Sequence, residues 1–469
     1  MALLAGDAGR LLRGSMLLIA GTMAGNVLNV VYTFLMARLL APPDYAALVA
    51  LISLFIVASL PAGTIQTVVA REVAIAEAAG DAGRPGAIVR RLLARLLPVA
   101  LLASAGLLAL ASPAAGYLQV DDPTPLRVLA LILGVLLLLP VLRGALQGRQ
   151  RFGALAGLGL LDVLVKLVLG AVLVRLGYGV TGAFAAMLAG AVAGLALTAV
   201  ALSHGHTAEA AAPDFAPLAP ALEPAGPGPA AAVVAGGKSG WRMGLATLLA
   251  LGGLNAMVTL DAVLVKHFFL PPEAGAYAAV SVLGRSLFWA SGAITLVVLP
   301  LAARRSAAGR SAPPSGRLGA VLGGHELLWL SGAIVLGLGV VAQGLFTAVP
   351  GLLLALLFGS SYRLAAPLLP LYGWAALCLA LANVAIYYLL GHGRAAPALI
   401  APLGALLQVA LIVALRQSLQ GVIVALLVAN AALLAASLVA LVAAGGRTRG
   451  ESQPVAEQEE QGSACRRQQ

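Results

Sequence analysis

The chain has 469 residues, of which 61% are hydrophobic and 10% are charged, and its mean hydropathy is +0.99. Soluble domains carry roughly 25% charged residues, so this composition excludes a soluble globular enzyme, a disordered protein and a coiled coil. The formal net charge is +11. Basic residues concentrate between apolar runs, where they determine membrane topology, and we expect no nucleic-acid partner.

Apolar runs follow one another along the whole chain, and each is long enough to cross a bilayer as a helix, which takes about 20 residues. They are continuous rather than alternating, which excludes transmembrane strands. We therefore predict an all-α polytopic membrane protein of about 12 transmembrane helices. The runs lie at 15–37, 46–70, 92–112, 126–146, 154–176, 180–202, 243–265, 274–300, 325–349, 368–390, 396–415 and 420–443.

The runs fall into two groups, separated by a Pro- and Ala-rich segment typical of a flexible linker. We expect an N-terminal six-helix bundle at 1–202, the linker at 203–240, a C-terminal six-helix bundle at 241–443 and a disordered tail at 444–469. Lys and Arg are enriched in alternate connecting segments. This asymmetry predicts that both termini, the linker and the tail lie in the cytoplasm.

The sequence offers little for metal or redox chemistry. Cys378 lies inside an apolar run and Cys465 lies in the tail, so neither a disulfide nor a Cys-ligated metal site is expected. The histidines are scattered without metal-ligand spacing. We predict no cofactor and no metal site.

The two halves of the chain match each other at an offset of 229 residues. Asn26 corresponds to Asn255, and Pro42-Pro43-Asp44 corresponds to Pro271-Pro272-Glu273. Six crossings return a chain to the side where it began, so the halves run in the same sense. The repeat predicts two bundles related by a pseudo-twofold axis along the membrane normal, with a substrate path between them.

Four short motifs carry a family resemblance: ARLLAPPDY at 37–45, RGALQGRQRF at 143–152, PPEAGAY at 271–277 and FGSSY at 358–362. They resemble the polysaccharide-type, Wzx-like flippases of the MATE-like multidrug/oligosaccharidyl-lipid/polysaccharide exporter superfamily. The resemblance covers most of residues 10–443. Ala46 departs from the family pattern, which has Gly after the first Pro-Pro-acid turn.

The resemblance implies a MATE-like fold and a flippase that carries polyprenyl-diphosphate-linked oligosaccharide from the inner to the outer leaflet of the bacterial inner membrane by alternating access. The product would serve cell-surface polysaccharide synthesis, such as lipopolysaccharide or exopolysaccharide. Expected partners are the lipid-linked oligosaccharide, membrane lipids, and a polysaccharide polymerase and glycosyltransferases. Such proteins are not enzymes, because they break no covalent bond.

Three basic residues are candidates for contact with a diphosphate, which favours fixed cations. Arg285 lies deep in an apolar run, where a basic residue is costly and by default functional. The alternative is a structural salt bridge. Arg38 and Lys266 lie near the outer ends of their runs. An interfacial anchor explains Arg38 equally well, and snorkelling to the interface is the favoured explanation for Lys266.

Three further charged residues are candidates for ion coupling or ion pairing. Asp162 and Lys166 are four residues apart, which favours a self-neutralised pair on one helix face. Asp261 is placed to pair with Arg285, line the path or bind a coupling ion. A structural role and a functional role both remain open for all three.

Amides within the runs are candidates for sugar contact, with hydrogen bonding between helices as the alternative. They are Asn26, Asn29 and Asn255. Pro61 lies inside the second run and predicts a fixed kink, with a gating bend as the alternative.

Two other functions compete with the flippase. A multidrug or cation antiporter of the same superfamily would favour an acidic path, whereas the deep charges here are mixed. A membrane-embedded glycosyltransferase or ligase would need a sizeable outer loop with catalytic groups, and the outer loops predicted here are short.

Overall fold

The computed structural model describes residues 7–81, 83–203, 238–307 and 326–450, and all regular secondary structure within these ranges is helical. Ten stretches of the described chain are long and apolar enough to cross a membrane. One of these stretches contains two crossing helices, α6 and α7. α10 is a further crossing helix, so the described residues contain twelve crossing helices. The predicted all-α fold is confirmed.

The first bundle contains six crossings, and the second of them is broken into two helices. In chain order its elements are α1 (Asp7–Leu39), α2 (Pro42–Ala58), α3 (Leu60–Ala78), α4 (Arg84–Tyr117), α5 (Thr124–Gly148), α6 (Phe152–Leu173), the π-helical turn η2 (Val174–Tyr178) and α7 (Gly179–Ser203).

The break between α2 and α3 falls at Ser59, two residues before Pro61. Proline has no backbone N–H, and its ring clashes with the carbonyl of the fourth preceding residue, which here is Val57. The side-chain hydroxyl of Ser59 donates a hydrogen bond to the Ile56 carbonyl at 2.7 Å. The helix is therefore interrupted next to Pro61, as the proline predicts.

The second bundle also contains six crossings, with a short helix and a 3-10 helix between the third and the fourth. Its elements are α9 (Lys238–Phe268), α10 (Pro271–Ala307), α12 (Glu326–Ala348), α13 (Pro350–Leu357), η4 (Ser360–Leu368), α14 (Leu369–Gly391), α15 (Pro397–Ala414) and α16 (Leu419–Gly450).

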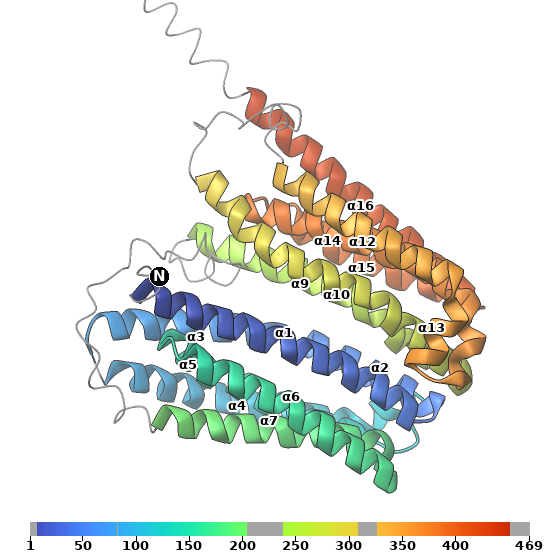
Figure 1. Cartoon of the computed structure of the whole chain (residues 1–469), viewed down its shortest axis with the longest axis horizontal. Coiled ribbons are helices and arrows are strands. Elements are labelled where there is room, and N and C mark those ends of the chain that lie inside the picture. Colours follow the sequence, from blue (N-terminus) through green and yellow to red (C-terminus); the bar gives the residue numbers. More distant parts are fainter. Residues whose placement is uncertain (1–6, 82, 204–237, 308–325, 451–469) are drawn as a thin grey trace, which may run out of the picture.

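The two bundles lie side by side, with their helices converging at one end and spreading apart toward the other (Figure 1). The convergent end holds the beginnings of α2 and α10 and the short helices α13 and η4. The divergent end holds the first residues of α1 and the last residues of α16. These two names are used below for the two ends of the molecule.

Helices from both bundles share one hydrophobic core at the convergent end. Tyr45 and Leu48 from α2 belong to the same buried cluster as Tyr277 and Val280 from α10. A Cβ atom on Gly275 would lie 2.6 Å from the backbone oxygen of Pro42, so glycine is required where the two helices meet. The convergent end is therefore a packed joint between the bundles.

The internal repeat has a structural counterpart in this joint. α2 begins at Pro42 and α10 begins at Pro271, which are the repeat-related prolines. Proline is favoured in the first turn of a helix because its missing N–H is not needed there. The repeated motif thus starts the equivalent helix in each half, and these two helices pack against each other.

The predicted domain boundaries remain a prediction. In the described chain α7 ends at Ser203 and α9 begins at Lys238, and most of the linker expected at 203–240 lies outside the described residues. α16 extends to Gly450, beyond the predicted end of the bundle at residue 443. The rest of the tail lies outside the described part.

Candidate functional site

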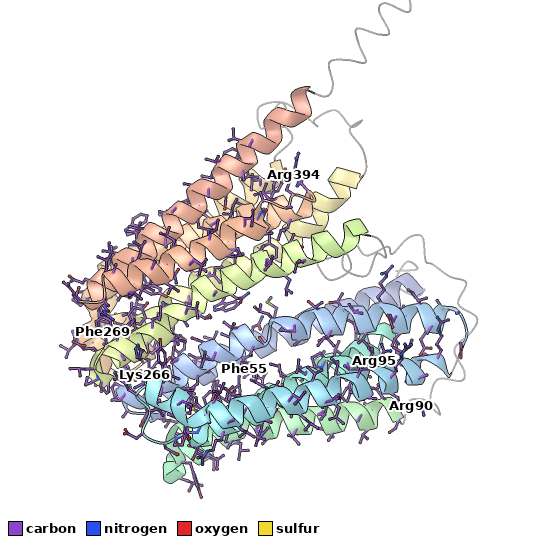
Figure 2. All side chains as sticks on the ribbon, turned by 180° about the vertical axis from the view of Figure 1, so that it is seen from behind. Phe55, Arg90, Arg95, Lys266, Phe269 and Arg394 are labelled. Atoms are coloured by element: carbon purple, nitrogen blue, oxygen red, sulfur yellow. The ribbon has the colours of Figure 1, made fainter. Side chains whose placement is uncertain are left out.

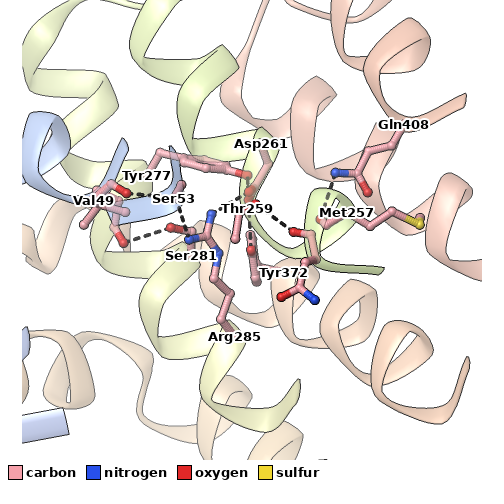
Figure 3. A network of polar contacts seen from close by, with 12 residues as sticks. Val49, Ser53, Met257, Thr259, Asp261, Tyr277, Ser281, Arg285, Tyr372 and Gln408 are labelled. Atoms are coloured by element: carbon pink, nitrogen blue, oxygen red, sulfur yellow. Dashed lines mark hydrogen bonds and ion pairs between the residues drawn. The ribbon is translucent and has the colours of Figure 1, made fainter. Parts of the chain in front are cut away.

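A buried ion pair joins α9 and α10 near the convergent end. Arg285 Nη2 lies 2.5 Å from Asp261 Oδ1, and the two residues are 8% and 1% exposed. The hydroxyls of Tyr277 and Tyr372 donate hydrogen bonds to Asp261 Oδ2 at 2.7 and 3.0 Å (Figure 3). Both carboxylate oxygens are thus satisfied, which a buried charge requires.

This network also reaches the first bundle. Arg285 Nη1 donates a hydrogen bond to Ser53 Oγ on α2 at 3.3 Å, and Ser53 Oγ donates to the Val49 carbonyl at 2.8 Å (Figure 3). Arg285 therefore links the ion pair of one bundle to a helix of the other. Of the two roles open for Arg285, pairing with Asp261 is the one seen in this arrangement of the bundles.

A cavity of about 20 Å³ adjoins Arg285. Arg285 Nε and Asn430 Oδ1, on residues that line it, are both buried and have no hydrogen-bond partner among the described residues. Asn430 Nδ2 already donates to the Ala375 carbonyl at 2.9 Å, so its Oδ1 remains as an acceptor. The cavity is large enough for about one water molecule and too small for a diphosphate.

Lys166 on α6 makes its direct contacts with neutral groups, although the Asp162 carboxylate one turn away remains within electrostatic reach. Its Nζ donates a hydrogen bond to Asn29 Oδ1 on α1 and lies 4.6 Å from the centroid of the Tyr32 ring. Across the described chain no carboxylate lies within 4.0 Å of Lys166 Nζ. A cation in a membrane-spanning segment without a direct ion pair is costly, and such residues mark functional sites by default.

Asp162 pairs with the neighbouring helix instead of with Lys166. Its Oδ2 lies 3.3 Å from Arg143 Nη2 on α5, and the two side chains are about one quarter exposed. A Cβ on Gly190 of α7 would lie 2.7 Å from Asp162 Oδ1, and one on Gly194 would lie 3.5 Å from Arg143 Nη2. The two glycines thus leave room for this pair, and the ion pair favoured within one turn of α6 is absent.

Lys266 and its neighbour His267 lie at the end of α9 and contact the end of α4 in the other bundle. Lys266 Nζ donates to the Gln119 carbonyl at 3.2 Å, and Gln119 Nε2 donates to the His267 carbonyl at 2.8 Å. The His267 ring stacks on Tyr117 with centroids 3.8 Å apart. Figure 2 places Lys266 at the convergent end. These contacts hold the two bundles together there.

Arg38 belongs to the same joint. Its guanidinium donates hydrogen bonds to the carbonyls of Leu356 and Leu357, the last two residues of α13. A cation at a helix C-terminus compensates the unpaired carbonyls and the helix dipole. Tyr362 of η4 adds a hydrogen bond to the Ala37 carbonyl at 3.3 Å. Arg38 thus links α1 to the second bundle.

The candidate amides differ in their surroundings. Asn29 Nδ2 donates to the Gly25 carbonyl and Asn255 Nδ2 to the Leu251 carbonyl, so each amide bonds within its own helix. Asn29 in addition holds Lys166. Asn26 is exposed and Asn255 is half-buried. Among the candidates, the structure brings together Asp261 with Arg285 and Asn29 with Lys166.

Several residues of these clusters carried no signal in the sequence. Tyr277 and Tyr372 are ordinary aromatic residues in apolar runs, and their role depends on Asp261 from another helix. Arg143 looked like one of many residues in a basic connecting segment. In the described part of the chain no three His, Cys, Asp or Glu side chains group as metal ligands would.

Comparison with known proteins shows what the chain resembles. A family model described as "Polysaccharide biosynthesis protein" matches residues 11–216. The chain is similar to the inward-facing conformation of a multidrug resistance MATE family transporter of the MOP superfamily, with a TM-score of 0.57, 15% identity, and coverage of 91% of this chain and 96% of that chain. No curated protein matches this chain.

Two further solved structures share the fold. The lipid II flippase MurJ in an inward closed conformation has a TM-score of 0.63 and 11% identity, covering 91% of this chain and 87% of its own. The MATE transporter ClbM in complex with Rb+ has a TM-score of 0.51 and 16% identity, covering 92% and 93%. At these identities the similarity concerns the fold.

Residues 11–216, a little under half of the chain, thus match the polysaccharide biosynthesis protein family model, and the chain as a whole has the MATE-like fold of a multi-pass membrane protein. This match agrees with the resemblance inferred from the motifs at 37–45 and 143–152, which lie within the matched residues.

Proposed function

We propose that the protein is a flippase that moves polyprenyl-diphosphate-linked oligosaccharide from the inner to the outer leaflet of a bacterial inner membrane. The family match supports a substrate on the route to surface polysaccharide. In this proposal the divergent end, with both termini, faces the cytoplasm, because the basic segments lie on that side.

Lys166 is the observation that carries the proposal. It lies in a membrane-spanning helix, and Asp162 is already paired with Arg143. An anionic headgroup supplies the direct ion pair that Lys166 does not make with Asp162, whereas a cationic drug would be repelled by Lys166. We therefore assign Lys166 to diphosphate contact, with the amides Asn26 and Asn29 on the adjacent helix placed for the sugar.

The joint at the convergent end fits the same proposal. Arg38, Lys266, Asp261 and Arg285 make contacts that hold the bundles closed at that end, and we assign them to the closure rather than to the bound headgroup. Moving the headgroup outward requires the joint to open while the divergent end closes. The lipid tail can remain in the bilayer throughout.

The test uses the purified protein in liposomes that contain a polyprenyl-diphosphate oligosaccharide. Translocation is measured by the exposure of the sugar to a membrane-impermeant glycosidase added outside. We expect Lys166→Gln to slow translocation at least tenfold and Lys166→Arg to retain most of it. Arg175→Gln, an exposed arginine in η2, is the matched control and should leave the rate unchanged.

A multidrug or cation antiporter is the second candidate, favoured by the similarity in fold to a multidrug resistance MATE family transporter. In that case ethidium efflux would depend on Asp162 or Asp261, and lipid-linked sugar would not move. Efflux without sugar translocation, or full translocation by the Lys166→Gln variant, contradicts the assignment made here.

A further inference from the structure

α4 is longer than a membrane crossing requires. It spans Arg84–Tyr117, 34 residues, which is about 51 Å at 1.5 Å per residue. The hydrocarbon core is about 30 Å thick and needs about 20 residues. Since Tyr117 lies at the convergent end, roughly 14 residues at the start of α4 extend past the hydrocarbon at the divergent end.

Three arginines in this extension share one face of the helix. Arg84, Arg91 and Arg95 are spaced by seven and four residues, which is about two turns and one turn. Leu102 follows Arg95 by another seven residues and is 72% exposed. The arginine face therefore continues directly into the apolar face that meets the lipid. Figure 2 shows Arg95 at the divergent end.

The opposite face of the same segment is packed against the protein. Leu92, Leu93 and Leu96 contact the buried cluster that contains Val69 and Val73 of α3. This packing fixes the rotation of α4. The arginine face is thus held outward, toward the headgroup layer beside the exposed leucine.

No guanidinium of the three arginines forms an ion pair in the described residues, and the nearby Asp81 carboxylate accepts a hydrogen bond from the backbone N–H of Arg84 at 3.1 Å. All three arginines are exposed, and none of their guanidinium groups is within 4.0 Å of a carboxylate in the described residues. Near this end of α5, Glu77 pairs with Arg149 and Asp162 pairs with Arg143, so these two acids are already engaged by other arginines. The positive charge of the face is left for an external anion.

We propose that Arg84, Arg91 and Arg95 bind the phosphate groups of anionic phospholipids in the leaflet at the divergent end. Guanidinium groups match phosphate oxygens with two parallel hydrogen bonds. Basic clusters next to a transmembrane helix attract anionic lipid surfaces. The adjoining Leu102 lies where the acyl chain of such a lipid would run, which favours a lipid over a free phosphate ion. This surface is independent of the transported substrate.

The test compares the protein in nanodiscs of phosphatidylcholine alone with nanodiscs that also contain phosphatidylglycerol. The midpoint temperature of unfolding is followed by tryptophan fluorescence at low salt, and bound phosphatidylglycerol is counted by native mass spectrometry. We expect phosphatidylglycerol to raise the midpoint of the unmodified protein. The triple variant R84Q/R91Q/R95Q should lose at least half of this rise and retain fewer bound lipids.

A matched control removes three exposed arginines from the convergent end, in the variant R127Q/R175Q/R363Q. This control variant should keep the full rise of the unfolding midpoint that phosphatidylglycerol causes. The proposal is overturned if phosphatidylglycerol does not raise the midpoint, if R84Q/R91Q/R95Q keeps the full rise, or if the control loses as much. It is also overturned if inorganic phosphate in phosphatidylcholine nanodiscs reproduces the effect.

Discussion

Tyr117 and His267 stack with ring centroids 3.8 Å apart and ring planes 7° from parallel, although they belong to different bundles. His267 Nδ1 also lies 2.6 Å from the Tyr117 carbonyl, and a carbonyl only accepts, so Nδ1 carries the proton. This pair exists only while the convergent end is closed. It therefore stabilises the present arrangement relative to any arrangement that is open there.

Replacing His267 by alanine should shift the population of bundle arrangements. The stack is worth about 0.5–1.5 kcal/mol and the hydrogen bond about 1 kcal/mol, together on the order of 2 kcal/mol. We expect an increase of roughly thirtyfold in the ratio of arrangements open at the convergent end to closed ones. Spin labels at Ala79 and Ala443, in a background without Cys378 and Cys465, would report a shorter distance across the divergent end.

His392→Ala is the matched control. His392 also packs on a tyrosine, Tyr388, with ring centroids 4.2 Å apart, and its Nδ1 lies 2.9 Å from the Tyr388 carbonyl. Both residues lie at the end of α14, so the contact does not cross between bundles. If His392→Ala changes the distance distribution as much as His267→Ala, the cross-bundle stack has no special role in closure.

The order and number of the helices followed from hydropathy, because a run of about 20 apolar residues has few alternatives in a bilayer. Pro61 also predicted its break, since the effect of proline is local. The ion-pair partners of the charged residues were harder to predict from the sequence. Asp261 and Arg285 were each conspicuous in an apolar run, and their pairing was one of the roles left open.

The ion-pair partner of Asp162 could not be predicted from the sequence. Spacing favoured Lys166, one turn away on the same helix. The actual partner, Arg143, is on the neighbouring helix and is reached because Gly190 lets α7 pack closely over the carboxylate. That choice depends on the packing of three helices. No pattern of neighbouring residues in the sequence predicts this choice of partner.

The ion pair of Asp261 and Arg285 should behave as a coupled unit. Asp261→Asn leaves a buried guanidinium without its counter-charge, and we expect a loss of about 3–5 kcal/mol in the free energy of unfolding. The double variant Asp261→Asn with Arg285→Gln removes both charges and should recover at least half of that loss. Reversible unfolding in mixed detergent micelles measures all three proteins.

The pair of Arg149 and Glu77, which is exposed at Glu77, provides the comparison for this prediction. Its atoms lie 3.0 Å apart, but the Glu77 side chain is 44% exposed. Surface ion pairs contribute about 0–1 kcal/mol, so Glu77→Gln should change the stability little. A double variant of Asp261 and Arg285 as unstable as Asp261→Asn alone would show that the two charges do not depend on each other.

The pair of Arg143 and Asp162 should control how strongly Lys166 attracts an anion. In Arg143→Gln the carboxylate of Asp162 loses its partner, and Lys166 is the next cation within reach on the same helix. We expect translocation of lipid-linked sugar to fall about as far as in Lys166→Gln. Adding Asp162→Asn removes the competing carboxylate and should restore transport, measured in the same liposome assay. Failure of this rescue would argue that Arg143 acts on transport by another route.

Close contact between α3 and α5 should be the packing feature most sensitive to added volume in the first bundle. A Cβ on Gly144 would lie 2.6 Å from the Gln66 carbonyl oxygen, and one on Gly148 would lie 2.5 Å from the Ala70 carbonyl oxygen. Backbone atoms cannot move aside without separating the helices. We expect Gly144→Ala and Gly148→Ala each to destabilise the protein by about 1–3 kcal/mol.

Gly106→Ala on α4 is the control, because a Cβ there meets nothing within 4 Å. This variant should be neutral or slightly stabilising, since alanine favours the helix more than glycine does. Thermal unfolding in one detergent ranks the three variants, and equal midpoints for Gly148→Ala and Gly106→Ala would refute the close approach of these helices.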